Sequence, residues 1–370
     1  MKSKKYVFIL FAVLILALTA CGDTEPDPDV TVYVAGGYMD GGKAIPCYWE
    51  DGVITSLDIL PDGASNVGVV GMAVSEGNIY MAARFNFGIG TKDKPYYWKI
   101  GDITPTPLDI PDEADNSYVF GITAQGENAY MSGNYRPDSD PGSYLTACYW
   151  KNGEKFDLEL PAGATNSIAH YIAVQGEDIY VFGEYWKPGG HSFCYWVNDV
   201  ITDLAYPAGA DSVNPTGFAV EGNKVCISGY YQVGEGKDAE NFPFYWENGT
   251  IRTLSFPAGY KSTIAEGITV QKGTVYICGY YSNDSEDGDD ITSIYWKNDK
   301  INKIAVPEGA LWTWTNGIAV NGSTVYIIGG FVDDENNTIN WLWENGTITI
   351  LEAPLGAKNP YTSSIVLVRK

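Results

Sequence analysis

The chain repeats one sequence unit seven times, and this repeat constrains the fold more than any other feature. The clearest copy, Phe244 to Tyr281, contains a Tyr-Trp pair, an Asn-Gly turn, an alternating run ending in proline, a Gly-Ile-Thr-Val run and a Val-Tyr-Ile run. A tryptophan and then a proline recur in each copy: Trp49, Trp98, Trp150, Trp196, Trp246, Trp296 and Trp343, and Pro61, Pro111, Pro161, Pro207, Pro257, Pro307 and Pro354. Seven copies in register predict an array of similar units rather than unrelated domains.

Each copy is expected to supply four short β-strands. Strand A is predicted at the Gly-Ile-Ala-Val run, strand B at the Val-Tyr-Ile run, strand C at the Tyr-Trp pair and strand D after the turn. Asn-Gly pairs such as Asn248-Gly249 supply the positive φ angles of a tight hairpin between strands C and D. Four-stranded units repeated radially form a β-propeller, which leaves only short, protected sheet edges.

The two ends of the repeat array predict how the ring closes. The first copy begins at strand B, Val32 to Tyr38, and the last copy ends with a strand A, Ser364 to Leu367. We therefore expect an all-β, seven-bladed propeller over residues 30–370, in which the C-terminal strand completes the blade of the N-terminal three. A solenoid would need polar caps at both ends, and the sequence shows none.

The order of the motifs YWxNG, GIAV and GYY resembles the HAF repeats of bacterial extracellular proteins and, more loosely, kelch blades. The resemblance covers about residues 30–370. The chain lacks the His-Ala-Phe triplet of HAF repeats, and the Gly-Gly doublet of kelch blades occurs only at Gly36-Gly37 and Gly329-Gly330. The resemblance implies a propeller and an extracytoplasmic location, and it carries over no catalytic residue.

The N-terminus predicts export and a lipid anchor. Three lysines precede the apolar run Val7 to Leu18, which is too short for a mature membrane span. Leu18-Thr19-Ala20-Cys21 resembles the lipobox of bacterial lipoproteins; an ordinary secretory signal with an incidental cysteine is the alternative. We expect a signal peptide at residues 1–20, lipidation at Cys21 and an acidic, Pro-rich tether at 21–29. The protein would then be lipid-anchored in the bacterial cell envelope, at the outer membrane or cell surface.

Charge and cysteine usage exclude several classes of partner. A formal net charge of −23 repels phosphate backbones and anionic headgroups, which argues against nucleic acid and leaves the lipid anchor as the only expected membrane contact. The other cysteines occupy strand positions that hold apolar or small residues or tyrosine in sister copies, so we expect buried hydrophobic side chains rather than disulfides or a metal site. They are Cys47, Cys148, Cys194, Cys226 and Cys278.

Functional residues on a repetitive scaffold are expected where the copies differ, because packing explains the shared positions. By this criterion the repeated tryptophans form inter-blade core rather than a sugar-stacking set. The varied positions lie in the expected D-to-A loop just before strand A and at the end of strand B. The D-to-A and B-to-C connections open on one face, where we predict a site for a carbohydrate or a protein. The candidate ligand-binding residues are His170, Glu266, Asn316, Trp312, Trp314, Tyr118, Phe120, Arg84, Asn134, Glu184, Tyr230, Tyr280 and Tyr361.

Catalysis is the alternative to binding. His170 with Glu266 or Glu184 would be the catalytic set of a propeller hydrolase or lyase that acts on a polysaccharide from the same face. A hydrogen-bonded structural histidine is the other interpretation of His170, and a structural envelope protein is a third possible function. HExxH, Walker, G-x-S-x-G and zinc-spacing motifs are absent from the sequence, which favours binding over catalysis.

No cofactor is expected. Asn283, Ser285 and Asp287 resemble the start of a calcium loop, but the twelfth position is Ile294 rather than glutamate. A solvated acidic loop is therefore the preferred interpretation.

Overall fold

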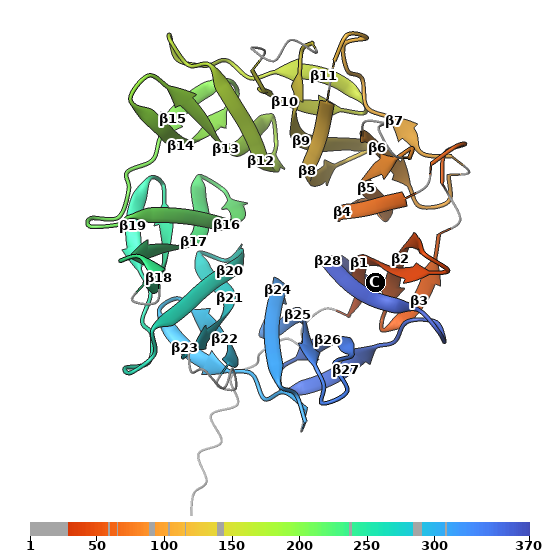
Figure 1. The fold of residues 1–370 in the computed structure, drawn as a ribbon, viewed down its shortest axis with the longest axis vertical. Coiled ribbons are helices and arrows are strands. Elements are labelled where there is room, and N and C mark those ends of the chain that lie inside the picture. The colour runs from red at the N-terminus through yellow and green to blue at the C-terminus, as the bar shows by residue number, and fades with distance from the viewer. Residues whose placement is uncertain are drawn as a thin grey trace, which may run out of the picture.

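The computed structural model describes residues 29–370 except 58–59, 65, 89–92, 103, 115, 139–143, 237–238, 284–290 and 308. Within these residues the chain forms strands β1 to β28 and no α-helix. The strands form seven blades of four around a common axis, with one strand of each blade innermost (Figure 1). The all-β, seven-bladed propeller predicted from the repeat is therefore confirmed. In the described part of the chain, no helix is long and apolar enough to span a bilayer.

The blades are numbered here in chain order, and each is given from its innermost strand outward. Blade 1 consists of β28 (Lys358–Arg369), β1 (Val30–Asp40), β2 (Lys43–Glu50) and β3 (Val53–Ser56). Blade 2 consists of β4 (Asn66–Ser75), β5 (Asn78–Asn86), β6 (Lys94–Lys99) and β7 (Thr106–Pro107). Blade 3 consists of β8 (Asn116–Gln125), β9 (Asn128–Arg136), β10 (Thr146–Lys151) and β11 (Glu154–Asp157). Blade 4 consists of β12 (Asn166–Gln175), β13 (Asp178–Lys187), β14 (Gly190–Val197) and β15 (Val200–Asp203).

The last three blades repeat this plan. Blade 5 consists of β16 (Ser212–Glu221), β17 (Lys224–Val233), β18 (Glu240–Glu247) and β19 (Thr250–Thr253). Blade 6 consists of β20 (Ser262–Gln271), β21 (Thr274–Ser282), β22 (Ile291–Lys297) and β23 (Lys300–Lys303). Blade 7 consists of β24 (Trp312–Asn321), β25 (Thr324–Val332), β26 (Thr338–Glu344) and β27 (Thr347–Leu351). A single parallel pair, Asn241 with Ser262, joins blades 5 and 6 into one hydrogen-bonded sheet.

Closure occurs as the sequence predicts. β28 pairs antiparallel with β1, from Val30 opposite Arg369 to Met39 opposite Lys358. The C-terminal strand therefore lies innermost in blade 1, beside the three N-terminal strands (Figure 1).

The repeated tryptophans lie between the blades, as predicted. Six of them are at most 2% exposed and Trp343 is 5% exposed. Several donate a hydrogen bond from Nε1 to a backbone carbonyl of the preceding blade, for example Trp246 to Ala205 at 2.8 Å and Trp196 to Glu159 at 2.8 Å. Each such tryptophan both fills a seam and bonds across it. The five cysteines of the blades are likewise buried, with free thiols.

The innermost strands begin earlier than predicted. In blade 4, for instance, the run Tyr-Ile-Ala-Val that corresponds to Gly-Ile-Ala-Val starts at Tyr171, whereas β12 begins at Asn166. A β-bulge between Ala169 and Tyr171 explains the difference, because the extra residue, His170, reverses the in–out alternation that marks a strand. The same irregularity recurs in all seven blades, so the varied residues assigned to D-to-A loops, including Trp312 and Trp314, lie in strands instead.

Candidate functional site

The positions that vary between the copies fall at three equivalent places in each blade, which we call columns. Two of these columns, one in the innermost strand and one in the second strand, lie directly opposite each other in the ladder between those strands. Tyr118 pairs with Asn134 and Trp314 with Gly330. The third column is the bulge residue itself: Val70, Phe120, His170, Thr216, Glu266, Asn316 and Ser363. Bulges redirect a side chain out of the regular ladder and are common beside active sites. The residues that differ between copies therefore gather along the inner strands, near their D-to-A ends.

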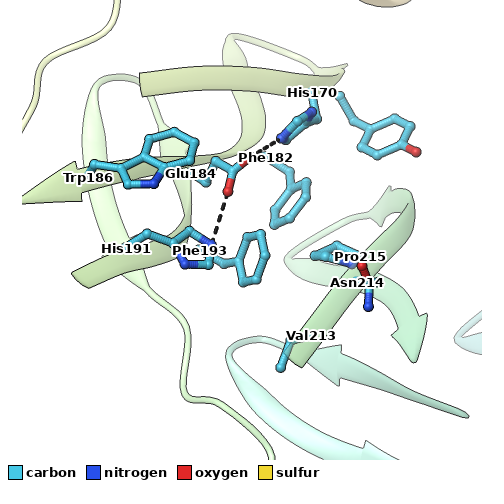
Figure 2. Close-up of a pocket in the computed structure, with 10 residues that line it drawn as sticks. His170, Phe182, Glu184, Trp186, His191, Phe193, Val213, Asn214 and Pro215 are labelled. Atoms are coloured by element: carbon cyan, nitrogen blue, oxygen red, sulfur yellow. Dashed lines mark hydrogen bonds and ion pairs between the residues drawn. The ribbon is translucent and has the colours of Figure 1, made fainter. Parts of the chain in front are cut away.

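A pocket opens between blades 4 and 5 on the face where the D-to-A and B-to-C connections lie. Its volume is about 480 Å³. Blade 4 contributes side chains from its three inner strands, and β16 of blade 5 supplies the opposite wall (Figure 2). The lining residues are His170, Tyr171, Phe182, Glu184, Trp186, His191, Phe193, Val213, Asn214 and Pro215.

One carboxylate in this pocket bridges both histidines of the protein. Nε2 of His170 lies 2.9 Å from Oε1 of Glu184, and Nε2 of His191 lies 3.0 Å from Oε2 of the same residue (Figure 2). Glu184 is 14% exposed and the two imidazoles 30% and 31%, so the cluster is sheltered but open to a ligand. Of the catalytic pairs considered from the sequence, the structure thus brings His170 and Glu184 together.

A short hairpin places the second histidine. Lys187 pairs with Gly190 across a Pro-Gly turn, in which Gly189 has φ = 105°. Trp186 is consequently opposite His191, and their rings stack with centroids 5.5 Å apart. The Tyr206 hydroxyl lies 3.2 Å from Nδ1 of His191.

Sequence reasoning missed His191 and Trp186, because the B-to-C connection varies too much in length to define an aligned column. The available signal was that His191 is one of only two histidines in the chain and follows a Pro-Gly-Gly turn.

A line of rings continues from this pocket toward blade 2. The centroid of Phe120 lies 5.7 Å from that of His170, and Tyr118 stacks on Phe120 at 6.2 Å. The Arg84 guanidinium lies over both rings, 5.8 Å from Tyr118 and 5.9 Å from Phe120. The structure therefore joins four predicted residues from blades 2, 3 and 4 into one surface: Arg84, Tyr118, Phe120 and His170.

Glu266 belongs to a different environment. Its Oε2 accepts a hydrogen bond from the Thr315 hydroxyl of blade 7 at 2.9 Å. Burial raises the pKa of Glu266 from 4.5 to about 7, although the Thr315 hydrogen bonds lower it in part. Burial and then the charge of Glu266 raise the pKa of Tyr280 to about 12, and the same two causes raise the pKa of Tyr230. Glu266 thus lies near Tyr230 of blade 5 and Tyr280 of blade 6, and it is not the carboxylate that contacts His170, which is Glu184.

The raised pKa of Glu266 makes stability depend on pH. The folded protein binds this proton more tightly than the unfolded chain, so the contribution is complete below pH 4.5 and disappears as the pH rises through about 7. We expect the free energy of unfolding to fall by up to about 3 kcal/mol between pH 4.5 and 8 from this group. Urea denaturation of wild type and Glu266→Gln across that range measures it as the difference between the two curves. Parallel curves would contradict the prediction.

Other candidates hold the fold together. Nδ2 of Asn316 donates to the carbonyl and the hydroxyl of Thr362 in the closing strand, at 3.1 and 2.9 Å. The Tyr361 hydroxyl accepts a hydrogen bond from the backbone of Val69 at 3.0 Å. Asn134 is buried, and Trp314 covers Gly330. Trp312 is 55% exposed.

The loop that resembles a calcium loop begins directly after β21 (Thr274–Ser282). Asn283 follows β21, while Ser285 and Asp287 lie outside the described residues. Among the residues that are described, no group of three or more His, Cys, Asp or Glu side chains is arranged to hold a metal ion.

Comparison with solved structures finds other β-propellers. The β-propeller domain of the trilobed protease from Pyrococcus furiosus superposes with a TM-score of 0.53 at 10% identity, over 89% of this chain and 97% of that one. The acylaminoacyl peptidase of Pyrococcus horikoshii gives 0.51 at 11% identity over 88% of this chain and 51% of its own, so the chain spans about half the length of that enzyme. A lectin from Aleuria aurantia in complex with α-methyl-L-fucoside gives 0.40 at 11% identity over 78% and 96%, a likeness too low to bear on function.

No protein-family model matches the chain, and neither does any curated protein. The likenesses to solved structures show the fold alone: the chain is a seven-bladed β-propeller protein.

Proposed function

We propose that the protein is a binding protein whose ligand is a carbohydrate, held on the D-to-A and B-to-C face in the pocket between blades 4 and 5. The supporting observation is the composition of this pocket. Rings of Trp186, Phe193 and His191 offer apolar faces, while Glu184 and Asn214 offer polar groups beside them. A concave site with rings and a few placed polar groups suits a sugar, which has both an apolar face and hydroxyls.

We propose further that the propeller is exported and carried on a lipid anchor. The support is the sequence of residues 1–29, which lies outside the described residues apart from Asp29. In this proposal Cys21 carries the lipid and residues 21–29 hold the propeller away from the membrane, at the outer membrane or cell surface. Mass spectrometry of the mature N-terminus tests it: an unmodified Cys21, or cleavage elsewhere, would contradict it.

Replacing Trp186 with alanine is expected to weaken glycan binding at least tenfold, because the ring that stacks on His191 forms part of the wall and its loss exposes the cavity. A glycan and peptide array, followed by titration calorimetry on the hits, measures this. Trp312→Ala is the control, since this exposed tryptophan lies in blade 7 and does not line the pocket. Binding to peptides only, or glycan binding unchanged in Trp186→Ala, would contradict the proposal.

A hydrolase or lyase acting on a polysaccharide is the second candidate, favoured by the 2.9 Å contact between His170 and Glu184. A carboxylate that orients an imidazole in this way prepares it as a general base. The same glycans, assayed for new reducing ends or unsaturated products, decide between the two. Turnover that disappears in His170→Ala, with glycan binding retained, would establish the enzyme.

A further inference from the structure

Another pocket on this face contains an arginine without an anionic partner among the described residues. Within the described residues, the Arg84 guanidinium contacts the rings of Tyr118 and Phe120 and makes no ion pair or hydrogen bond. A guanidinium presents five donors in a planar fork that matches a carboxylate. Two rings hold this fork in place, so its charge and its donors are available to a ligand.

Blade 2 leaves an open space beside Arg84. Gly68 lies directly opposite Arg84 in the ladder. The same register position holds a side chain in each other blade: Tyr118, Ile168, Asn214, Ile264, Trp314 and Tyr361. A Cβ atom added at Gly68 would meet no atom within 4 Å.

Glycines also occur at this cross-strand pair in blades 1 and 7, but there the space beside them is filled. Gly37 and Gly330 are covered by the rings of Tyr361 and Trp314, which a Cβ atom at either glycine would touch at 2.9 and 2.3 Å. Only blade 2 has a glycine here that its partner does not cover. The result is a pocket of about 310 Å³ lined by Gly68, Arg84, Asn66, Val67, Asn86 and Asp93, which we name the Arg84 pocket.

The charges of the Arg84 pocket suit a single carboxylate. Among the described residues that line the pocket, Arg84 is the only cation and Asp93 the only anion, and Oδ1 of Asp93 accepts a hydrogen bond from the Asn86 amide at 2.8 Å. The net charge of −23 opposes the approach of a densely charged polyanion. Recognition must therefore depend on one short-range contact with Arg84.

The Arg84 pocket and the pocket of His170 lie at two ends of the same line of rings. Tyr118 and Phe120 stack beside Arg84, and Phe120 in turn contacts His170. A ligand of several sugar units can follow these rings from one pocket to the other.

We infer that Arg84 binds the carboxylate of an acidic sugar, a uronic acid unit, in an oligosaccharide whose further units lie over Tyr118 and Phe120 toward His170. This inference rests on the proposed carbohydrate-binding function and adds the chemical class of the ligand. No covalent step is involved.

The test uses uronic-acid-containing tetrasaccharides, each paired with its carboxyl-reduced form, titrated against the full-length protein. Wild type is expected to prefer the acidic member of at least one pair about tenfold or more. Arg84→Gln is expected to remove this preference and to leave the affinity for the reduced form within about twofold, because only the ionic contact is lost. Arg84→Lys keeps the charge without the fork and should retain part of the preference.

Two more variants separate binding from folding. Gly68→Ile introduces the isoleucine that blades 4 and 6 have at this register position, and its side chain fills the Arg84 pocket. The affinity for the acidic ligand should fall about tenfold, while the thermal midpoint should stay unchanged. Arg252→Gln is the matched control, because this exposed arginine pairs with Glu247 on an outer strand.

The outcomes are distinguishable. Glycan binding that depends on Trp186 but shows no preference for the carboxylate overturns this inference and leaves the proposed function standing. A preference that survives Arg84→Gln also overturns it. Binding to no glycan, or only to peptides through their C-terminal carboxylate, overturns both.

Discussion

Removing β28 (Lys358–Arg369) is expected to prevent the propeller from folding. The strand completes blade 1 by pairing with β1 along its length, and Ile365 and Leu367 pack against the buried cluster around Val34 and Trp49. Each ladder hydrogen bond contributes about 1 kcal/mol, and each of these partly buried aliphatic side chains also about 1 kcal/mol. Their sum approaches the ~5–15 kcal/mol that stabilises a typical domain. Far-UV circular dichroism and thermal melting of a chain ending at residue 357 measure the effect.

Adding the missing strand back provides the control. A synthetic peptide of residues 358–369 should restore the melting transition of the shortened chain in proportion to its concentration, because binding to the folded state stabilises it by mass action. The same residues in scrambled order should not, since β28 is held in one register by a bulge at each end of its central segment. A shortened chain that melts like the full chain would show that closure contributes little.

The sequence was sufficient to predict the propeller because the repeat marks each blade several times over. Tryptophan, proline and turn positions recur together, so an error at one position is corrected by the others. Closure was predictable for the same reason: the first copy lacks its innermost strand and the last copy supplies one. The propeller and its closure both depend on contacts between distant residues, yet both can be read from the sequence, because the repeat shows where each copy begins and ends.

The bulges were not predictable, because they erase the signal that identifies a strand. A bulge residue such as His170 shifts the alternation by one, and the segment before it then resembles a loop. The same shift turns these residues out of the ladder, so their variation between copies was correctly noticed although its structural cause was not. The positions proposed to contact a ligand and the positions whose local structure was poorly predicted therefore coincide.

The contact between His170 and Glu184 illustrates what aligned columns do and do not provide. Both residues are candidates because they differ from their equivalents in other blades. The comparison of copies does not show, however, that neighbouring strands of one blade bring their side chains within 2.9 Å of each other. His191 lay in no column at all. Its position depends on one tight hairpin in blade 4, which is a local exception to the repeat. Exceptions of this kind are visible only in the three-dimensional structure.

Replacing Trp246 with alanine is expected to destabilise the protein by about 4 kcal/mol. Its side chain is fully buried between blades 4 and 5, where it packs edge-on against Phe244 and contacts Phe193 of the neighbouring blade. Tryptophan-to-alanine changes in a core cost about 3–5 kcal/mol. The change also removes the hydrogen bond to the Ala205 carbonyl, worth about 1 kcal/mol. Urea denaturation at pH 7 measures the loss as a lower midpoint.

The proposed ligand site makes the Trp246 variant informative beyond stability. Phe193 and Val213 line the pocket between blades 4 and 5 and belong to the same buried cluster as Trp246, so a cavity in this seam should loosen one wall of the pocket. Glycan affinity should therefore fall with stability in Trp246→Ala. Trp296→Ala should cost similar stability, because Trp296 occupies the equivalent seam between blades 5 and 6, but should leave affinity unchanged. Equal losses of affinity in both variants would indicate a general softening of the ring rather than a site built on this seam.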